Sequence, residues 1–495
     1  MSLRFIALFL FVFQFTVGYR ASLLFTALRV HYQNITFSLG NIALIDKIDS
    51  ETDFFESVLG NIGGRSRSFI PAVKLLISNK LNQSVSINKL LDFTPDELLK
   101  LFGFEDRISD RSLYRVLERI GENQPVIVER FQHWIKQQNL VDPTQFMDFS
   151  SSYFEGTHCP LGKRGYSRDN QPGKLQFTFG ISVGLNNIPT MLTIQKGNVQ
   201  DKTHMRALIR LCSKVMPKES LLVFDCGGNT LENKRKIRKL KFHYLTLKAK
   251  KKGPYRKEIA VFHSEKENQV SFVSNNRGYS CVKNPNEEEI RYVFFSEDLE
   301  RDQLSKKADK FQRELEKGLK LSKKVERGKD LGQYIAPKGW IIARGHLQKT
   351  LGEIPNPYVT GLEGFFILES SVDDEPENIL EAYKNRDMAE KFIRDLKEGA
   401  EMRPIRHWSK HAVIGFVLIV FLTKVLVSLT QFFCKNPIVK NLKVLKNFLT
   451  NLTLTIVYPH FGFGVRFISN FLPELHPIFG DFIQKYGCLE LPSRW

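Results

Sequence analysis

The sequence predicts an α/β protein built on a mixed sheet with flanking helices. A helical domain precedes the sheet, and a β-rich, charged insertion interrupts it. Two observations support this: the apolar pattern changes near residue 144 from a helical period to strand-like runs, and Lys and Glu become abundant from about residue 250 to 355. We therefore expect six parts: an atypical apolar N-terminal segment, a helical and candidate DNA-binding domain, the first part of the core, the insertion, the second part of the core, and a C-terminal region (1–40, 41–140, 141–250, 251–355, 356–430 and 431–495).

The helical domain contains a pair of short helices separated by a tight break. Residues 94–121, "TPDELLKLFGFEDRISDRSLYRVLERIG", begin with a Thr-Pro start signal, break near "GFEDRIS" and restart at a Ser or Asp cap. Such a pair is typical of a helix-turn-helix DNA reader. It is also typical of two packed helices in a small bundle, so both interpretations stay open.

Two apolar segments raise the question of a membrane or an export signal. The first 20 residues combine one early Arg, an apolar run and a small-residue end, which is the pattern of a secretory signal. Residues 411–433 are nearly long enough to span a bilayer, which takes about 20 apolar residues. Lys424 lies in the middle of this run, where a charge is costly in lipid, so a helix buried in a soluble core is an equal alternative.

The cysteines point to a reducing compartment. The six cysteines are far apart, and none forms a C-x-x-C pair. In a chain of this length we therefore expect neither a disulfide framework nor a Cys-rich zinc site. A cytoplasmic, nucleoid-associated protein is the simplest expectation.

The core elements follow one another in a recognisable order. Three strands come first, the second and third joined by a turn at "NN"; a helix, a strand, a helix and a strand follow (144–154, 175–185, 188–195, 202–215, 220–225, 229–240 and 241–248). Three antiparallel strands followed by helix, strand, helix and strand is the element order of a ribonuclease-H-like domain. Within the insertion we expect strands and one long charged stretch (259–264, 269–274, 290–296 and 304–329). The core resumes with a strand at 364–370, then a helix that begins near Pro376 and stops near Gly399.

Two aspartates occupy neighbouring strands of this predicted sheet. Asp148 lies within the first strand, and Asp225 ends the apolar strand "LLVFD" before the break "CGGN". Ligands in open α/β sheets bind at the carboxyl ends of the strands. In a ribonuclease-H-like sheet these two strands are neighbours, so we expect the two carboxylates to meet.

A third carboxylate comes from the charged helix 383–397, "YKNRDMAEKFIRDLK". At about 100° per residue, Tyr383, Arg386, Glu390 and Lys397 fall within about 60° of arc. This stripe could be an ordinary solvated face, because several opposite charges are spaced i, i+4. It could also bring Glu390 to the two aspartates, where clustered carboxylates need hard cations such as Mg²⁺. Two such ions suit phosphodiester displacement.

The charge of the chain favours a polyanionic partner. There are 72 Lys and Arg against 53 Asp and Glu, a net charge of +19, which suits nucleic acid or an anionic membrane. The loop "GKRGYSRDNQPGK" places Lys163, Arg164 and Arg168 around Tyr166, a combination that suits phosphate contact with base stacking. A soluble hairpin loop is the alternative. The basic helix "NKRKIRKLKF" could likewise follow a DNA backbone or be a solvated face.

Three separated motifs resemble the DDE insertion-sequence transposases. Tyr383, Arg386, Glu390 and Lys397 match the Y-x2-R-x3-E-x6-K signature of that family. The string "DFSSSYFEG", followed by "CPLGKRGYSRDNQPGKLQF", resembles the branch with a D-x-T-S-S-Y-F-E-G-like string, and "VFDCGGNTLEN" is similar to the family's V-x-D-x-G-like strand end. The resemblance covers roughly residues 41–430. It departs at Cys226, where the family commonly has Arg.

The resemblance implies a site and a reaction. Asp148, Asp225 and Glu390 would be catalytic and would bind two Mg²⁺, with Mn²⁺ as the alternative ion. The reaction would be cleavage at transposon ends and strand transfer into target DNA by the 3′-hydroxyl. Tyr383 and Arg386 would hold a displaced-strand phosphate, and Lys397 would contact the DNA end. The partners would be double-stranded DNA, as terminal inverted repeats and target, and a second copy in a synaptic homodimer.

Other hypotheses stay open beside this one. A catalytically inactive, transposase-derived DNA-binding protein is the first, motivated by Cys226 and the unusual N-terminus. A membrane or exported protein is the second, motivated by the two apolar segments. In a transposase the run 411–433 would instead be the buried core helix that follows the catalytic helix.

Overall fold

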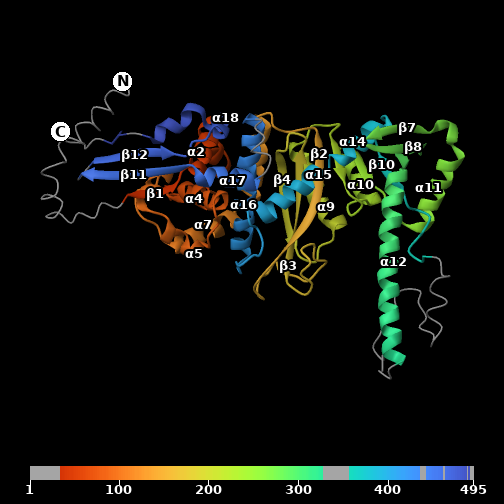
Figure 1. The fold of residues 1–495 in the computed structure, drawn as a ribbon. Helices are drawn as coiled ribbons and strands as arrows, with labels where there is room; N and C mark the ends of the chain where they lie inside the picture. The colour runs from red at the N-terminus through yellow and green to blue at the C-terminus, as the bar shows by residue number, and fades with distance from the viewer. Residues whose placement is uncertain (1–33, 327–355, 435–441, 461–462, 488, 491–495) are drawn as a thin grey trace.

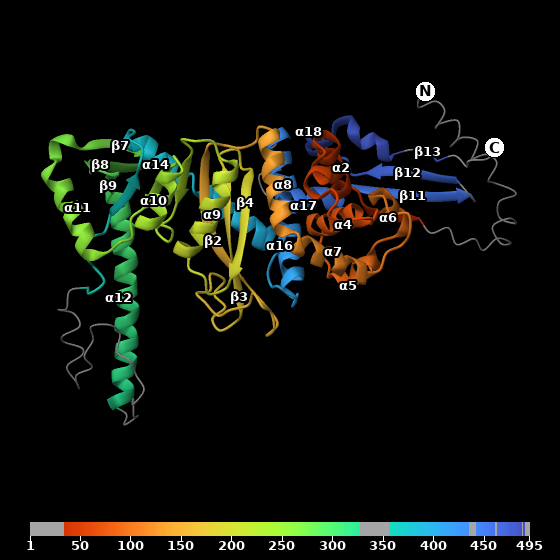
Figure 2. The ribbon, with the colours of Figure 1, turned by 180° about the vertical axis from the view of Figure 1, so that it is seen from behind.

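The computed structural model describes residues 34–326, 356–434, 442–460, 463–487 and 489–490. Most of the predicted apolar N-terminal segment, and the last part of the predicted insertion, lie outside the described residues. The described part is elongated, as Figures 1 and 2 show: a helical domain occupies one end and a large sheet the middle. The long helix α12 (Glu297–Glu326) projects from the far end.

A nine-stranded mixed sheet forms the core. Its order is β4-β3-β2-β5-β6-β10-β9-β8-β7. The first five strands along the chain are β2 to β6 (Thr144–Tyr153, Gln176–Gly184, Pro189–Lys196, Leu221–Phe224 and His243–Leu247). Strand β2 is antiparallel to β3 and parallel to β5, and β5 is parallel to β6. This is the predicted ribonuclease-H-like arrangement, and the α/β fold class is confirmed.

The predicted insertion extends the same sheet instead of standing apart from it. Strands β7, β8 and β9 (Val270–Ser274, Arg277–Pro285 and Ile290–Phe295) are antiparallel neighbours that continue the sheet beyond β10 (Phe365–Ser370). The strand predicted at 259–264 is wrong, because these residues end helix α11 (Lys252–Ser264). Tyr255, Ile259 and Phe262 recur at helical spacing and are buried against this end of the sheet.

Helices cover both faces of the sheet. Helix α9 (Asp201–Val215) packs on β3 and β4, and helix α15 (Asp387–Arg394) packs on β2 and β3. Successive side chains of a strand point to opposite faces. Phe149 contacts His204 of α9, with ring centres 5.1 Å apart, whereas its neighbour Asp148 faces Arg386 at the start of α15. The two helices therefore lie on opposite faces, and α15 covers the face that carries Asp148.

The helical domain contains α2 to α8 (Gly40–Thr52, Phe54–Leu59, Phe69–Leu81, Ile87–Leu90, Asp96–Phe102, Asp110–Glu122 and Gln124–Gln137). The C-terminal region returns to this end of the molecule. Its strands β11, β12 and β13 (Thr453–His460, Phe463–Ser469 and Leu489–Glu490) form a second sheet with β1 (Ile35–Ser38), in the order β1-β11-β12-β13. Helices α17 (Leu442–Asn451) and α18 (His476–Phe479) pack on α2.

The helix pair predicted at 94–121 is present as α6 and α7. Helix α6 is followed by Gly103 in the left-handed region (φ 93°), and Ser109 caps α7 by accepting a hydrogen bond from the Ser112 N–H. Helix α7 lies closely along helix α16 (Lys410–Cys434): a Cβ added at Gly121 or Gly415 would collide with the backbone of the facing helix. This extensive contact favours the packed-helix interpretation over the DNA reader.

Helix α16 (Lys410–Cys434) is the apolar run seen in the sequence. By length and composition it could cross a membrane, with a mean hydropathy of 2.6 over its most apolar window. However, 94% of that window is buried inside the protein, against α7, α4 and α2. Lys424 is only 2% exposed, and its Nζ forms an ion pair with Asp395 Oδ2 at 2.8 Å. The mid-helix charge is thus neutralised by the core that surrounds it, as expected of a buried core helix.

Candidate active site

The two aspartates occupy matching positions on neighbouring parallel strands. The register of β2 and β5 pairs Thr144 with Leu221 and ends at Met147 paired with Phe224. The next residues in both strands are Asp148 and Asp225, so the two carboxylates lie at adjacent points of the same edge. Asp225 follows β5 directly, and its Oδ1 accepts a hydrogen bond from the Gly227 N–H at 2.9 Å. The turn after the strand thereby orients the carboxylate.

The helix that carries the third carboxylate is not a single α-helix. Helix α14 (Pro376–Lys384) begins at the predicted proline, but the chain then breaks at Asn385 and Arg386 before α15 begins. A π-helical turn, Asp395–Gly399, follows α15 directly. The predicted arc of Tyr383, Arg386, Glu390 and Lys397 assumed a constant turn of about 100° per residue. That assumption does not hold before or after α15. Arg386 and Glu390 keep their i, i+4 relation, and Lys397 does not keep its predicted place.

Arg386 lies beside Asp148 and Glu390, and the charge of Asp225 also acts on it. Its Nη1 is 3.7 Å from Asp148 Oδ1, and its Nη2 forms an ion pair with Glu390 Oε1. Burial works against the charge on Arg386, but Tyr383, Asp148, Glu390 and Asp225 together raise its pKa. All three carboxylates are thus close enough to act on one guanidinium. They come from β2, the end of β5 and α15.

Two raised pKa values show that the site is buried and negatively charged. Burial, with smaller contributions from Asp225 and Glu390, raises the pKa of Asp148 to about 7 although Arg386 opposes the rise. Burial also raises the pKa of Tyr383 to about 12, and the negative charge of Asp225 adds to the effect. The guanidinium carbon of Arg386 lies 5.8 Å from the centre of the Tyr383 ring. Arg386 therefore supplies the counter-charge for the whole group.

The donor atoms fit a hard divalent cation. Carboxylate oxygens are the ligands that Mg²⁺ prefers, and the raised pKa of Asp148 marks a buried carboxylate whose charge Arg386 does not fully compensate. Among the residues that the structure describes, no three His, Cys, Asp or Glu side chains are grouped closely enough to hold a metal ion. The pairing of Glu390 with Arg386 accounts for this, because it keeps the 51%-exposed Glu390 carboxylate on the guanidinium. The assignment of Glu390 as the third ligand stays a prediction.

The structure places Lys397 away from the surface expected of a DNA contact. Its side chain is 7% exposed, and its Nζ donates to Asp169 Oδ1 at 2.7 Å. Arg403 Nη1 donates to the same oxygen, also at 2.7 Å, and Asp169 is 1% exposed. The π-helical turn explains the difference, since the extra residue per turn rotates Lys397 inward. In this arrangement Lys397 connects the π-helical turn after α15 to the basic loop that contains Asp169.

The basic loop between β2 and β3 divides into exposed and internal cations. Lys163, Arg164 and Tyr166 are exposed, Tyr166 by 85%, and neither cation has an ion pair within the described ranges. Arg168 differs, because its Nη2 donates to both carboxylate oxygens of Asp201 at 2.6 and 2.5 Å. Lys163 and Arg164 are therefore available to a ligand, whereas Arg168 anchors the loop to the start of α9.

The basic helix proposed at 233–242 is engaged within the protein in part, while its Arg235, Lys239 and Lys241 are exposed. Lys234 is 8% exposed and pairs with Glu289 and Glu369, and Arg238 pairs with Glu288. Sequence reasoning missed a better candidate, the run Lys250–Lys252 after β6. Lys251 and Lys252 are exposed and lie just beyond the edge at which β5 and Asp225 end, because β5 and β6 are parallel and in register. The string "KAKKK" (248–252) marks this run in the sequence, where it lies at the boundary between the predicted core and the predicted insertion.

Two acids near the ends of neighbouring parallel strands of a ribonuclease-H-like sheet, with a third acid on a facing helix, are an arrangement used by proteins that act on phosphodiesters with divalent metal ions. Residues 142–425 match the family described as the transposase DDE domain. Because this match covers more than half of the chain, the protein belongs to that family, and the predicted relationship is confirmed.

The other comparisons add two findings. A search of curated proteins found no match. Among solved structures, a piggyBac transposase in a synaptic complex with hairpin DNA is similar, with 10% sequence identity and a TM-score of 0.38. The similarity covers 83% of this chain and 78% of that chain.

Proposed function

We propose that this transposase cleaves DNA at transposon ends and joins the freed 3′-hydroxyl to target DNA. The observation that carries the proposal is the position of Arg386. Its Nη1 is 3.7 Å from Asp148 Oδ1, its Nη2 pairs with Glu390, and the charge of Asp225 also raises its pKa. Acidic side chains from three separate elements thus act on one guanidinium. An ordinary solvated helix face would pair Arg386 with Glu390 but would not bring it to an aspartate of the sheet such as Asp148.

Each residue has a role that follows from its position. The three carboxylates would hold two Mg²⁺, which, when bound, activate an attacking oxygen and stabilise a leaving one. Arg386 is 18% exposed and presents a planar guanidinium suited to bidentate contact with a phosphate beside Asp148. The phenol of Tyr383 stays protonated at neutral pH, since its pKa is about 12, so it can donate a hydrogen bond to the same phosphate.

The DNA would approach along the exposed cations. Lys163 and Arg164 can contact the backbone, and Tyr166 offers a ring on which a base can stack. Lys251 and Lys252 extend the positive surface near the end of β5. Partners on this proposal are double-stranded DNA, as terminal repeats and target, and a second copy of the chain that brings two ends together.

The chemistry of the cysteines suits a cytoplasmic, nucleoid-associated location, which we propose with the function. The five cysteines in the described part of the chain are free thiols. Free thiols persist in a reducing compartment, where disulfides are rare.

The test compares Glu390→Gln with the wild type on DNA that carries the flanks of the gene, in Mg²⁺ and in Mn²⁺. We expect the wild type to cut at the element boundary, and Glu390→Gln to bind the same DNA without cutting. Glu381→Gln is the matched control, because Glu381 is exposed on α14 and forms no ion pair within the described residues; it should cut normally.

Two results would contradict the proposal. Cleavage by Glu390→Gln at the wild-type rate would remove Glu390 from the site. Tight binding without cleavage by any of the three proteins would support the alternative, a transposase-derived DNA-binding protein that no longer cuts.

A further inference from the structure

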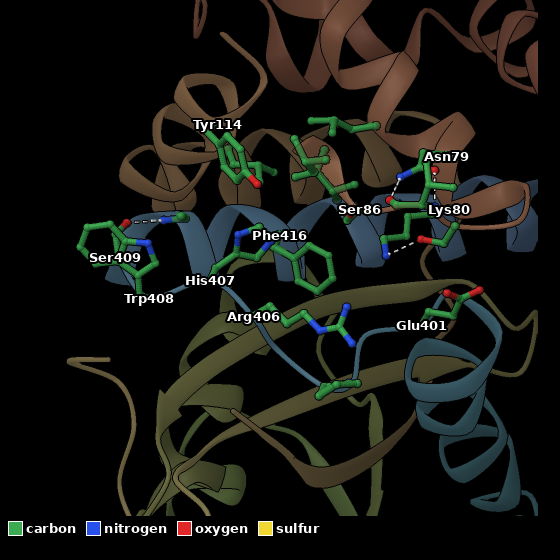
Figure 3. A pocket seen from close by; sticks show the side chains of 18 of the residues that line it. Asn79, Lys80, Ser86, Tyr114, Glu401, Arg406, His407, Trp408, Ser409 and Phe416 are labelled. Atoms are coloured by element: carbon green, nitrogen blue, oxygen red, sulfur yellow. Dashed lines mark hydrogen bonds between the residues drawn. The ribbon is translucent and has the colours of Figure 1, made fainter. Parts of the chain in front are cut away.

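A cavity lies between the helical domain and the segment that follows the catalytic helix. Its volume is about 550 Å³, within the range of about 300–1,000 Å³ usual for small-ligand sites. Helices α4, α7 and α16 form one side, and residues 401–409 form the other (Figure 3). This segment is fixed to the core, because Ile405 exchanges backbone hydrogen bonds with Tyr153 and Glu155 at the end of β2. The cavity is thus joined to the strand that carries Asp148 but does not include the carboxylates.

A buried ammonium group faces this cavity without a carboxylate partner. Lys80 is 8% exposed, and its Nζ donates to Ser84 Oγ at 3.0 Å. The same Nζ lies 4.7 Å from the centre of the Phe416 ring. No ion pair to Lys80 occurs within the described ranges. Burying a cation without an anion is costly, so this position favours a ligand that brings negative charge.

The other charged groups of the cavity leave a net positive charge. Arg406 is exposed, forms no ion pair within the described part of the chain, and extends toward the side of the cavity where Lys80 lies (Figure 3). Arg403, which also lines the cavity, pairs with Asp169 and Glu398. Of the two acids, Glu401 pairs with Lys446 at 3.1 Å. Burial lowers the pKa of Lys80, and the charge of Glu401 opposes this effect without forming an ion pair with Lys80. Glu118 lies at the rim and accepts a hydrogen bond from Ser409 at 3.3 Å.

Aromatic side chains occupy the other part of the cavity. Trp408 is 77% exposed, an unusual position for the largest apolar side chain. Near it, the ring of His407 lies 6.1 Å from that of Tyr114 and 4.9 Å from that of Phe416. Burial and the charge of Lys80 lower the pKa of His407 to about 4, so its ring is neutral near pH 7. Flat, uncharged rings of this kind stack on nucleobases.

We propose that this cavity binds one nucleotide unit, with its phosphate between Lys80 and Arg406 and its base against Trp408. The proposal rests on the proposed function for its source, a strand of the DNA substrate. A free nucleotide has the same chemistry and is the other source to be tested. Either ligand would neutralise Lys80 and cover Trp408, the two features of the cavity that the protein itself leaves unsatisfied.

The test measures binding in EDTA, where cleavage does not occur. The probes are a fluorescein-labelled single-stranded decanucleotide, AMP and inorganic phosphate, with anisotropy and competition as the readouts. We expect Lys80→Met and Trp408→Ala each to raise the Kd for the decanucleotide by about tenfold, the loss of one charge-assisted hydrogen bond or one stacked base. Lys89→Met and Phe93→Ala are the matched controls, because both residues are exposed outside the cavity; each should stay within about twofold of wild type.

The competition separates the sources. Weak displacement by AMP would assign the site to the DNA strand, whereas AMP binding as tight as that of the decanucleotide would overturn that source. Unchanged affinity in folded Trp408→Ala and Arg406→Gln would overturn the inference as a whole, even if Lys80→Met failed to fold. Cleavage that depends on Glu390, with unchanged nucleotide binding in these variants, would refute this inference and leave the proposed function standing. Loss of nucleotide binding in these variants, together with no DNA cleavage by the wild type, would support this inference and refute the proposed function.

Discussion

Lys397 offers the sharpest test of the structure against the sequence signature. The signature places this lysine on the DNA end, whereas the structure buries it on Asp169 at 2.7 Å, with 7% of its side chain exposed. We compare Lys397→Met, which keeps the length of the side chain, with Asp169→Asn. Because this ion pair is buried, both substitutions should act on stability, and neither should act chiefly on DNA binding.

The magnitudes follow from what each substitution leaves behind. Lys397→Met leaves Asp169 with Arg403, still at 2.7 Å, so we expect a loss of about 1–3 kcal/mol in the free energy of unfolding. Asp169→Asn leaves Lys397 buried without a carboxylate, and we expect about 3–5 kcal/mol. The double variant should lose less than the sum of the two, because the residues share one contact.

The assay is urea unfolding followed by circular dichroism, with DNA affinity measured over a range of salt concentrations. Loss of one phosphate contact lowers the slope of log K against log salt by about 1. We expect that slope to be unchanged in Lys397→Met. A variant that unfolds like the wild type, and whose salt slope falls by about 1, would show that Lys397 contacts DNA and that the buried arrangement is wrong.

Three further predictions concern the core helix, the cavity and the basic loop. Asp395→Asn should lower the unfolding free energy by about 3–5 kcal/mol, because it leaves the ammonium of Lys424, which is 2% exposed, without its carboxylate. Lys424→Met should lower it less, because the carboxylate of Asp395 is 23% exposed to water. Equal losses in the two variants would contradict this reasoning. Burial lowers the pKa of Lys80 from 10.5 to about 8, so the unfolded chain holds this proton to higher pH. Its contribution to stability should therefore rise from pH 8 to 10.5, by about 3 kcal/mol relative to Lys80→Met, and parallel pH profiles of the two proteins would refute the shift. Replacing both Lys163 and Arg164 by Ala should lower the salt slope of DNA binding by about 2 without changing unfolding; an unchanged slope would remove the loop from the DNA path.

The elements that could be predicted were those with a strong local pattern. Strands β2 to β6 have period-2 or continuously apolar runs, and their order along the chain determined the topology. The neighbouring positions of Asp148 and Asp225 followed from that topology, because β2 and β5 are parallel and Met147 pairs with Phe224. The pairing of β1 with β11 could not be predicted, since it joins residues such as Thr36 and Thr455, 419 positions apart, and neither segment has a distinctive local signal.

The segment that carries Glu390, residues 383–399, shows a different limit of sequence reasoning. Opposite charges at i, i+4 fit α15, but the break at Asn385 and the π-helical turn after Arg394 depend on contacts from outside the helix. Two of these contacts are two residues apart in the turn: Asp395 binds Lys424 of α16, and Lys397 binds Asp169 of the basic loop. Side chains two residues apart in a helical turn point to nearly opposite sides, and here each side offers a buried partner.

These contacts suggest why one signature combines catalytic and structural residues. On the proposed function, Glu390 can act only if α15 keeps its place above Asp148 and Asp225. The buried face of α15 packs on β2 and β3, and two ion pairs beyond its C-terminal end hold the chain that follows it. Lys424 holds the end of the helix from the core side, and Asp169 holds it from the loop side through Lys397. The neighbour of Asp169, Arg168, binds Asp201 at the start of α9 on the opposite face of the sheet. Lys397 can therefore serve the chemistry by positioning the helix, without touching DNA.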